Sequence, residues 1–339
     1  MDRPLVIAGP CSAESESQVL ETARGLKPLG VGVFRAGLWK PRTHPGGFEG
    51  VGEKGLSWLA RVREETGMKT ATEVAGAKHV EVCLESGAVD ILWIGARTTS
   101  SPFLVQEIAE ALRGTDIPVF VKNPLSPDMD LWSGALERLS GVGSLGLIHR
   151  GFTPSGSSPW RNDPLWRIAI EMRTRFPGMP FLVDPSHIGG DRRFVGELSQ
   201  KALDLGFDGL MIEAHCNPSE ALSDAAQQLS PSQLGEILSS LRLRRQDSDD
   251  AAYREVIDSL RARIDDIDES LLALLADRQA VSREIGRYKK EHGIAIVQAA
   301  RWDEVMTSVL ERAEALGLPA DTVRRIFTAI HAASVRSQE

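Results

Sequence analysis

Short apolar segments recur at regular intervals between residues 4 and 215, and this spacing restricts the possible folds more than any other feature of the sequence. There are eight of them, and they begin 22 to 37 residues apart. They span residues 4–9, 31–37, 68–74, 90–96, 118–123, 144–151, 181–187 and 209–215. Each interval can hold one helix and two loops, as a right-handed crossover between parallel strands requires. Eight such units in about 240 residues predict an α/β fold, the (β/α)8 TIM barrel.

The segments are apolar almost throughout rather than at alternate positions, which indicates strands buried on both faces. A doubly wound open sheet is the alternative arrangement. It would place a phosphate-binding glycine turn directly after a strand, and none of the eight segments leads directly into one. We therefore expect the barrel.

A different pattern begins near residue 253, after the polar stretch LRRQDSDDAAY. Apolar residues then recur at steps of three and four, which predicts one amphipathic helix more than 30 residues long. They are Ile257, Leu260, Ile264, Ile267, Leu271, Leu274, Val281, Ile285 and Tyr288. Two shorter helices are expected at 299–316 and 320–337. We predict the barrel in residues 1–245, a linker in 246–252 and a small all-α three-helix domain in 253–339.

The composition excludes several classes of protein. The net charge of −8 argues against a general affinity for nucleic acids or anionic membranes. No apolar run approaches the roughly 18 residues of a membrane span, and we expect no signal peptide at the N-terminus. The three cysteines, without a CxxC pair, do not form a disulfide framework. We expect a cytoplasmic protein.

In a TIM barrel, chemistry takes place at the C-terminal ends of the strands. Cationic side chains gather at these predicted ends or in the loops just beyond them. They are Arg35, Lys40, Arg42, Arg97, Lys122 and Arg150. Solvated surface charges are the alternative interpretation, but they would be scattered over the helices as well. In an acidic protein this gathering predicts a site for more than one phosphate or carboxylate group.

A second set of side chains at the same ends has the chemistry of metal ligands. Cys11, His187, Glu213 and Asp224 combine sulfur, nitrogen and oxygen donors, which suit a divalent transition metal such as Mn, Fe, Co or Zn. Taken alone, each residue is more typical of a buried thiol or a core histidine. Their shared position at strand ends favours a metal site.

The motifs AGPCSAES, RAGLWKPRT, IGARTT, VKNP, HRGF, VDPSH and EAHCNPSEALSDAAQQL together resemble the 3-deoxy-D-arabino-heptulosonate 7-phosphate (DAHP) synthase family. The resemblance implies condensation of phosphoenolpyruvate with erythrose 4-phosphate, with a divalent metal as cofactor, manganese being preferred over Co, Fe or Zn. It implies Cys11, His187, Glu213 and Asp224 as metal ligands. The implied phosphoenolpyruvate contacts are Arg35, Lys40, Arg97, Lys122 and Arg150. It implies that Arg42 and Thr43 bind erythrose 4-phosphate. Lys40 would give a proton to the new alkoxide.

Two related activities are alternatives for the barrel. The synthase of 3-deoxy-D-manno-octulosonate 8-phosphate typically has a KANRS-like sequence where this chain has KPRT at 40–43, so KPRT favours the four-carbon sugar. An aldolase that forms a Schiff base on Lys122 is more distant, because it does not explain the Cys/His/Glu/Asp set.

The long helix carries cations on its apolar face. Arg278 lies in line with the apolar stripe, and Lys289 shares its face about 16 Å further along the axis. A buried stripe seldom accepts arginine unless an anion meets it. The alternative is a coiled-coil dimer in which both side chains extend to solvent.

The motifs LRARIDDIDESLLALLADR, IGRYK, AARW and ASVRSQ resemble the all-helical chorismate mutase family. This resemblance implies rearrangement of chorismate to prephenate in a homodimer formed by the helical domain. The implied substrate contacts are Arg261, Arg278, Lys289, Gln298, Arg301, Ser334 and Gln338. Lys289 and Gln338 would be catalytic, at the ether oxygen. Two positions depart from the usual pattern: Trp302 stands where an acidic residue is common, and Gln298 where an aspartate can occur.

Together the two resemblances imply a bifunctional enzyme, a transferase and an isomerase, in the biosynthesis of aromatic amino acids. We expect prephenate to inhibit the synthase, because the helical domain is then the available ligand sensor. The alternatives are a helical domain that mainly dimerises and senses a ligand, with weak mutase activity, and a binding-only sensor on an inactive barrel.

Overall fold

The computed structural model describes residues 4–40, 46–244, 248–296 and 299–338. The chain divides into two compact units, Met1–Gln246 and Asp247–Glu339. Each unit is described by itself.

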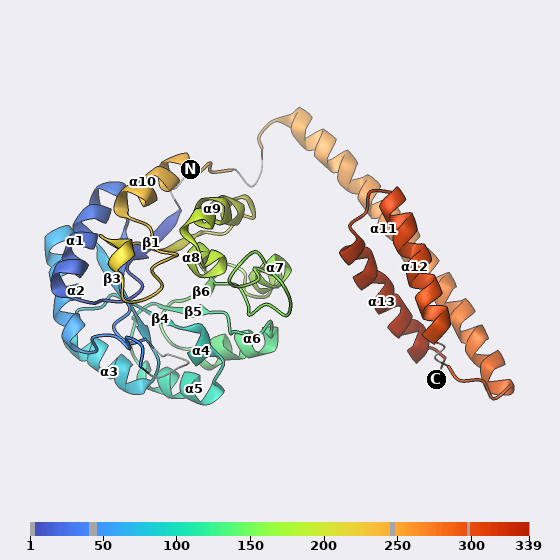
Figure 1. Cartoon of the computed structure of the whole chain (residues 1–339), viewed down its shortest axis with the longest axis horizontal. Coiled ribbons are helices and arrows are strands. Elements are labelled where there is room, and N and C mark those ends of the chain that lie inside the picture. The colour runs from blue at the N-terminus through green and yellow to red at the C-terminus, as the bar shows by residue number, and fades with distance from the viewer. Residues whose placement is uncertain (1–3, 41–45, 245–247, 297–298, 339) are drawn as a thin grey trace. The chain divides into compact units, whose positions relative to one another are not determined.

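The first unit is a closed barrel of eight parallel strands in sequential order (Figure 1). The strands are β1 Leu5–Gly9, β2 Val33–Arg35, β3 Lys69–Val74, β4 Ile91–Ile94, β5 Val119–Lys122, β6 Leu145–His149, β7 Phe181–Val183 and β8 Gly209–Glu213. Every predicted segment contains one of these strands, and β1 pairs with β8 to close the sheet. The predicted TIM barrel is confirmed.

Helices surround the sheet and connect successive strands (Figure 1). They are α1 Glu16–Leu26, α2 Lys54–Thr66, α3 Ala77–Ser86, α4 Ala96–Thr99, α5 Pro102–Ala111, α6 Met129–Arg138, α7 Trp166–Arg175, α8 Pro185–Gly189, α9 Val195–Asp204 and α10 Pro231–Ser240. Short 3₁₀ helices lie at Lys27–Leu29, Arg192–Phe194 and Pro218–Glu220.

Apolar side chains fill both faces of the sheet. The barrel interior holds a cluster to which all eight strands contribute, and a larger cluster lies between the sheet and the helices. The inner cluster consists of Ile7, Val33, Ala71, Ile91, Trp93, Phe120, Ile148, Leu182 and Met211. Burial on both sides explains why the strand segments are apolar at nearly every position.

Strand β7 is shorter than the predicted segment 181–187, which was wrong at its C-terminal end. It stops at Val183, and Asp184 caps the short helix α8 by accepting a hydrogen bond from the backbone N of His187. Pro185 occupies the first turn of α8, where its missing N–H is tolerated. His187 is therefore positioned by a helix and not by a strand.

The sequence contains two matches to GxGxxG, at 50–55 and 141–146. The first lies at the start of α2, far beyond the end of β2, and the second leads into β6. Neither is a turn from a strand directly into a helix, which is the arrangement that dinucleotide binding requires.

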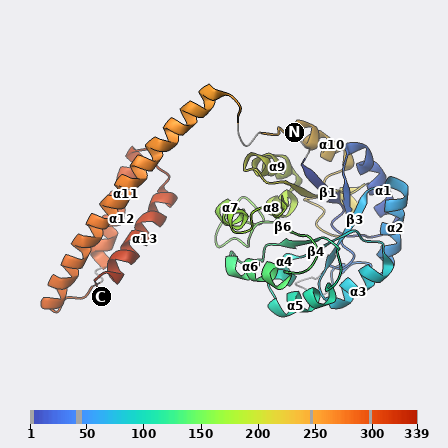
Figure 2. The ribbon, with the colours of Figure 1, turned by 180° about the vertical axis from the view of Figure 1, so that it is seen from behind.

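The second unit consists of three helices, α11 Ala251–Glu291, α12 Ala299–Ala315 and α13 Ala320–Arg336 (Figure 2). Helix α13 packs against both α11 and α12. The predicted three-helix domain is confirmed, but α11 begins at Ala251, inside the expected linker. Asp250 caps it by accepting hydrogen bonds from the backbone N atoms of Ala252 and Tyr253, and alanine favours helix.

The apolar stripe of α11 is largely exposed within one chain. Only Ser282 and Gly286 of this helix are buried. The exposed members of the stripe are Leu260, Ile264, Ile267, Leu271, Leu274, Val281, Ile285 and Tyr288. Despite the length of α11, none of the described helices is apolar enough over a sufficient length to cross a membrane.

Candidate functional site

A cavity opens at the C-terminal ends of the barrel strands, and it brings together every predicted barrel residue that the structure describes. These residues are Cys11, Arg35, Lys40, Arg97, Lys122, Arg150, His187, Glu213 and Asp224. They come from loops, strand ends and short helices after seven different strands other than β3. Arg42 and Thr43 lie outside the described residues.

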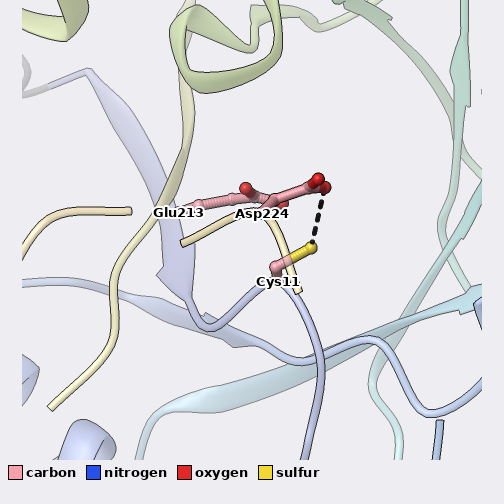
Figure 3. Close-up of side chains that lie close together, drawn as sticks. All are labelled: Cys11, Glu213 and Asp224. Carbon is pink, nitrogen blue, oxygen red and sulfur yellow. Dashed lines mark hydrogen bonds between the residues drawn. The ribbon is translucent and has the colours of Figure 1, made fainter. Parts of the chain in front are cut away.

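Three of the predicted metal ligands form a tight cluster (Figure 3). Donor atoms of Cys11, Glu213 and Asp224 all lie within 4.8 Å of one another, and Cys11 Sγ is 3.3 Å from Asp224 Oδ2. His187 lies beside the cluster and not within it, with its Nε2 3.7 Å from Glu213 Oε1. Glu213 Oε1 is buried and accepts no well-aligned hydrogen bond from the described residues. The same oxygen is ion-paired with Arg35, whose Nη2 lies 3.3 Å away. A carboxylate oxygen held beside a thiol and a second carboxylate fits a divalent cation.

The Lys40 ammonium lies among these ligands. Its Nζ contacts Cys11 Sγ and is 2.8 Å from Asp224 Oδ2. Burial alone would lower the pKa of Lys40, but the neighbouring Cys11, Glu213 and Asp224 raise it above its ordinary value. Burial alone would raise the pKa of Asp224, and the charge of Lys40 holds it well below its usual range. In this arrangement Lys40 stays protonated.

Burial dominates the chemistry of the Cys11 thiol. It raises the pKa of Cys11 to about 12, and the charge of Glu213 adds to the rise. The side chain therefore carries its proton in this structure. Metal binding would have to release that proton, since the thiolate is the ligand.

A buried carboxylate connects the histidine to one of the cations. Asp184 Oδ2 lies 2.8 Å from His187 Nδ1 and 2.6 Å from Lys122 Nζ. Burial alone would raise the pKa of Asp184, but His187 and Lys122 hold it well below its usual range. Burial lowers the pKa of His187, although Asp184 and Glu213 oppose this. The contact to Asp184 turns Nε2 of the ring toward Glu213.

Two of the arginines are buried, and one of them has hydrogen-bonding capacity to spare. Arg35 lies over the ring of the buried Trp93, 4.8 Å from its centroid, and its Nε and Nη1 have no partner among the described residues. Arg150 donates from Nη1 to Asn162 Oδ1 at 2.8 Å, and burial lowers its pKa to about 10. Arg35 Nη2 pairs with Glu213, and its two remaining buried donors fit a bound anion.

Sequence reasoning missed two residues that line this cavity, Glu73 and Arg161, and one that contacts its lining, Asp184. Asp184 directly follows β7 and could have been found as a polar residue at a strand end. Glu73 lies within β3 and accepts a hydrogen bond from Trp93 Nε1 at 3.0 Å. Arg161 pairs with Asp224 at 3.2 Å, but it lies in an irregular segment between β6 and α7 that has no periodic pattern.

In the helical unit the structure brings together part of the predicted set. Arg278 donates a hydrogen bond to Ser334 Oγ, which links α11 to α13. Gln338 packs closely against Gly286: a Cβ atom added at Gly286 would lie only 2.8 Å from the Gln338 backbone. The side-chain Oε1 of Gln338 is buried without a partner among the described residues. Lys289 Nζ donates to Ile296 O at 2.7 Å.

The remaining predicted residues of this unit lie apart. Arg261 pairs only loosely with Asp258 at 3.6 Å, and Arg301 pairs with Glu304 at 2.9 Å; both arginines are exposed. Gln298 lies outside the described residues. Trp302 stacks on His331 with ring centroids 4.1 Å apart, which joins α12 to α13.

Residues 1–247 match the model of the DAHP synthetase I family. The chain belongs to this family. A DAHP synthase crystal structure from Thermotoga maritima superposes on it with a TM-score of 0.63 at 33% identity, covering 70% of this chain and 67% of the other.

Two curated relatives agree with the barrel's assignment to this group of synthases. A phospho-2-dehydro-3-deoxyheptonate aldolase of Thermotoga maritima is 34% identical over 226 residues, which are 66% of this chain and 64% of that protein. This chain thus spans less than two thirds of that relative. A 2-dehydro-3-deoxyphosphooctonate aldolase of Syntrophotalea carbinolica is 32% identical over 247 residues, 66% of this chain and 84% of that protein.

Residues 260–339 match the model of chorismate mutase type II. The chain therefore joins a DAHP synthase domain to a chorismate mutase domain. Both resemblances drawn from the sequence motifs are confirmed.

Proposed function

We propose that this chain is a bifunctional enzyme of aromatic amino acid biosynthesis. Its barrel condenses phosphoenolpyruvate with erythrose 4-phosphate to DAHP and phosphate, and its helical domain rearranges chorismate to prephenate. The observation that carries the first activity is the cavity in which the buried Arg35, with two unused donors, lies beside the cluster of Cys11, Glu213 and Asp224. The three cysteines are free, which fits a reducing compartment, the cytoplasm.

The residues that would hold a divalent metal are Cys11, His187, Glu213 and Asp224, with manganese the preferred ion. The clustered donor atoms of Cys11, Glu213 and Asp224 support this set, and so does His187 Nε2, which lies 3.7 Å from Glu213 Oε1. When bound, the metal would polarise the aldehyde of erythrose 4-phosphate as a Lewis acid.

The cations of the cavity have separate roles in the proposed reaction. Arg35, Arg97, Lys122 and Arg150 bind the phosphate and carboxylate of phosphoenolpyruvate, while Arg42 and Thr43 bind the sugar phosphate. C3 of phosphoenolpyruvate attacks the aldehyde, water adds at C2, and phosphate then leaves the hemiketal. Lys40, which its acidic neighbours keep protonated, gives the proton to the new alkoxide.

A two-activity assay on the full-length protein tests this function. We expect DAHP formation to disappear when a chelator removes the metal and to return with added Mn²⁺, while prephenate formation continues. Erythrose 4-phosphate should be a better substrate than arabinose 5-phosphate, because of the KPRT sequence. A preference for arabinose 5-phosphate would contradict the proposed substrate.

The mutase site is proposed to form between two chains. Arg261 and Arg278 are 17 residues apart on the continuous helix α11, which places them about 25 Å apart along its axis. One straight helix cannot bring both guanidinium groups to a single small substrate. We infer that Arg261 enters the site of a second chain, in a two-fold homodimer with two shared sites.

The other mutase residues act by holding the substrate. Arg278, Arg301 and Ser334 would bind its carboxylates, and Lys289 and Gln338 would stabilise the negative charge that develops on the ether oxygen. Gln298 would face the substrate hydroxyl. No nucleophile is needed for this rearrangement.

The stacking of Trp302 on His331 supports a second candidate function for the helical domain. An aromatic wall replaces the acidic group that the family usually offers there. In this alternative the domain mainly dimerises and senses a ligand, with weak mutase activity. If Trp302→Glu raises the mutase kcat above that of the wild-type protein, the alternative is favoured. If Trp302→Glu lowers the mutase kcat, a working mutase is favoured.

We further propose that prephenate inhibits the synthase through the helical domain, since the two activities share one chain. In full-length protein, Arg278→Ala should abolish inhibition by prephenate while the uninhibited synthase rate stays unchanged. Equal sensitivity of the wild-type and variant proteins would contradict this regulation.

A further inference from the structure

Two adjacent glutamines, Gln227 and Gln228, lie directly behind the cluster of Cys11, Glu213 and Asp224. They follow β8 in the segment that leads to α10. Both are fully buried, with exposed fractions of 1% and 0%. Buried amides are kept where their hydrogen bonds are satisfied, so their partners indicate what they hold.

Gln227 connects one ligand to a cation. Its Nε2 donates to Glu213 Oε2 at 2.6 Å, and its Oε1 accepts from Arg161 Nη1 at 2.7 Å. Its backbone N also donates to Asp224 O at 3.2 Å. The bond to Oε2 fixes the Glu213 carboxylate in one orientation and leaves Oε1, the atom without a well-aligned partner, toward the cluster.

Gln228 ties together the two segments that carry the other ligands. Its Oε1 accepts from the backbone N of Cys11 at 3.0 Å, and its Nε2 donates to Ser223 O at 2.8 Å. Cys11 and Asp224 are 213 positions apart in the chain, so their approach depends on such cross-links.

The backbone at Asp224 needs this support. Its φ is +46°, in the left-handed region that a non-glycine residue rarely adopts. A strained conformation of this kind persists only when surrounding contacts determine it. The contacts from Gln227 N to Asp224 O and from Gln228 to Ser223 O hold the residue on both sides.

An amide is the side chain that position 227 requires. It must accept from a guanidinium and donate to a carboxylate, and a neutral amide does both. Glutamate would accept from Arg161, but it would present a second negative oxygen to Glu213. These two partners therefore fix the orientation of the Gln227 amide, with Oε1 toward Arg161 and Nε2 toward Glu213.

We propose that Gln227 and Gln228 are positioning residues that hold Cys11, Glu213 and Asp224 in the arrangement that binds the divalent metal. This inference rests on the proposed metal site. Removal of a group that orients a metal ligand typically weakens metal binding about 10- to 100-fold. We expect a loss in the same range here.

The test is metal binding by the full-length, metal-free protein. Mn²⁺ binding is measured by calorimetry, and Co²⁺ binding by the absorption band that a Cys11 thiolate–cobalt bond produces. The variants are Gln227→Met and Gln228→Met, which keep the side-chain length without the hydrogen bonds. Gln106→Met, at a half-buried glutamine of α5 outside the cavity, is the matched control. We expect Kd to rise about 10-fold or more in both variants and to stay unchanged in the control.

Gln227→Glu separates hydrogen bonding from size. It keeps the Arg161 contact but loses the donor to Glu213, so its Kd should rise at least as much as that of Gln227→Met. If a methionine variant does not fold, Gln227→Asn, which keeps an amide and is shorter by one methylene, provides the same comparison. Wild-type Kd in the variants would overturn this inference alone, whereas absence of metal binding by the wild-type protein would overturn the proposed cofactor as well.

Discussion

The two domains differ in how far they bury the arginine side chains proposed to bind substrate. In the barrel, Arg35 is 2% exposed and lies over the ring of Trp93. In the helical domain, the side chain of Arg261 is 74% exposed, and Leu272 and Leu274 of the same helix α11 are 67% and 65% exposed. A barrel closes on itself and encloses a site within one chain. Helix α11, with 41 residues against 17 in each of α12 and α13, is too long for its own partners to cover.

This difference indicates what each site needs from outside its own chain. The barrel site needs only small ligands from outside, an anion and the proposed metal ion, because Nε and Nη1 of the buried Arg35 have no partner among the described residues. For the helical site we propose that a second chain supplies a whole surface, because a contiguous exposed apolar stripe of this length is typical of an interface. The barrel is thus expected to respond to loss of single ligating groups, and the helical domain to loss of its second chain.

The largest expected effect is on the barrel alone. Cys11→Ala removes the thiol ligand, so DAHP formation should fall about 1,000-fold or more, the equivalent of several kcal/mol of charge stabilisation. Prephenate formation should remain within about twofold of wild type, because the other domain supplies that site. Initial rates of both reactions provide the measurement. Cys83→Ala, a buried cysteine of α3, is the control and should retain both activities.

A mixing experiment addresses the helical domain. Arg261→Ala and Arg278→Ala should each lower mutase kcat/KM about 100-fold, since each removes a charged contact to a carboxylate. After subunit exchange between the two variants, activity should recover toward about a quarter of wild type, because half of random dimers are mixed and each has one intact site. Proven exchange without recovery would mean that each chain builds its own site.

A charge placed in the apolar stripe should separate the two domains. Leu274→Glu puts a carboxylate in the proposed interface, so the dimer should dissociate and mutase activity should fall about 10-fold or more. The synthase rate of the same protein should change little. Light scattering together with the two assays measures this. Glu269→Lys, on the opposite face of α11, is the matched control; its dissociation would show that the stripe is not the interface.

The last prediction concerns the acid stability of the barrel and leaves both activities at neutral pH unchanged. Burial lowers the pKa of His149 from 6.5 to about 4, where it packs against Trp132, Phe152 and Trp166. Between these values the unfolded chain binds a proton that the folded barrel does not, so stability falls as the pH falls from 6.5 to 4. The loss should reach about 3 kcal/mol. Urea unfolding at several pH values tests it, and His149→Phe should flatten the dependence in this window.

The sequence predicts the architecture well because the spacing of apolar residues follows the burial of their side chains. The spacing of eight apolar segments corresponds to the eight strands, and the step of three and four corresponds to α11. The end of β7 was misjudged because Pro185 and Asp184 look like a continuation of the strand until the cap of α8 is seen. Boundaries depend on such local hydrogen bonds, which apolar patterns do not encode.

The site was predictable where chemistry falls at strand ends and not elsewhere. Cys11, Glu213 and Asp224 share that position and a resemblance to a family, whereas Arg161 and Gln227 act through long-range pairing between irregular segments. The placement of His187 outside the cluster of three also depends on its contact with Asp184. Only folding brings these residues together, so no spacing in the sequence indicates them.

The position of Trp93 gives the barrel an optical reporter. Its ring is fully buried, with Arg35 4.8 Å and Lys122 Nζ 5.9 Å from its centroid. The emission wavelength of indole depends on the electric field across the ring, and an anion that binds beside these two cations changes that field. The difference in emission between the wild-type protein and Trp93→Phe therefore follows occupancy of the anion site before any bond is made or broken. Binding and chemistry can then be timed separately in one cuvette.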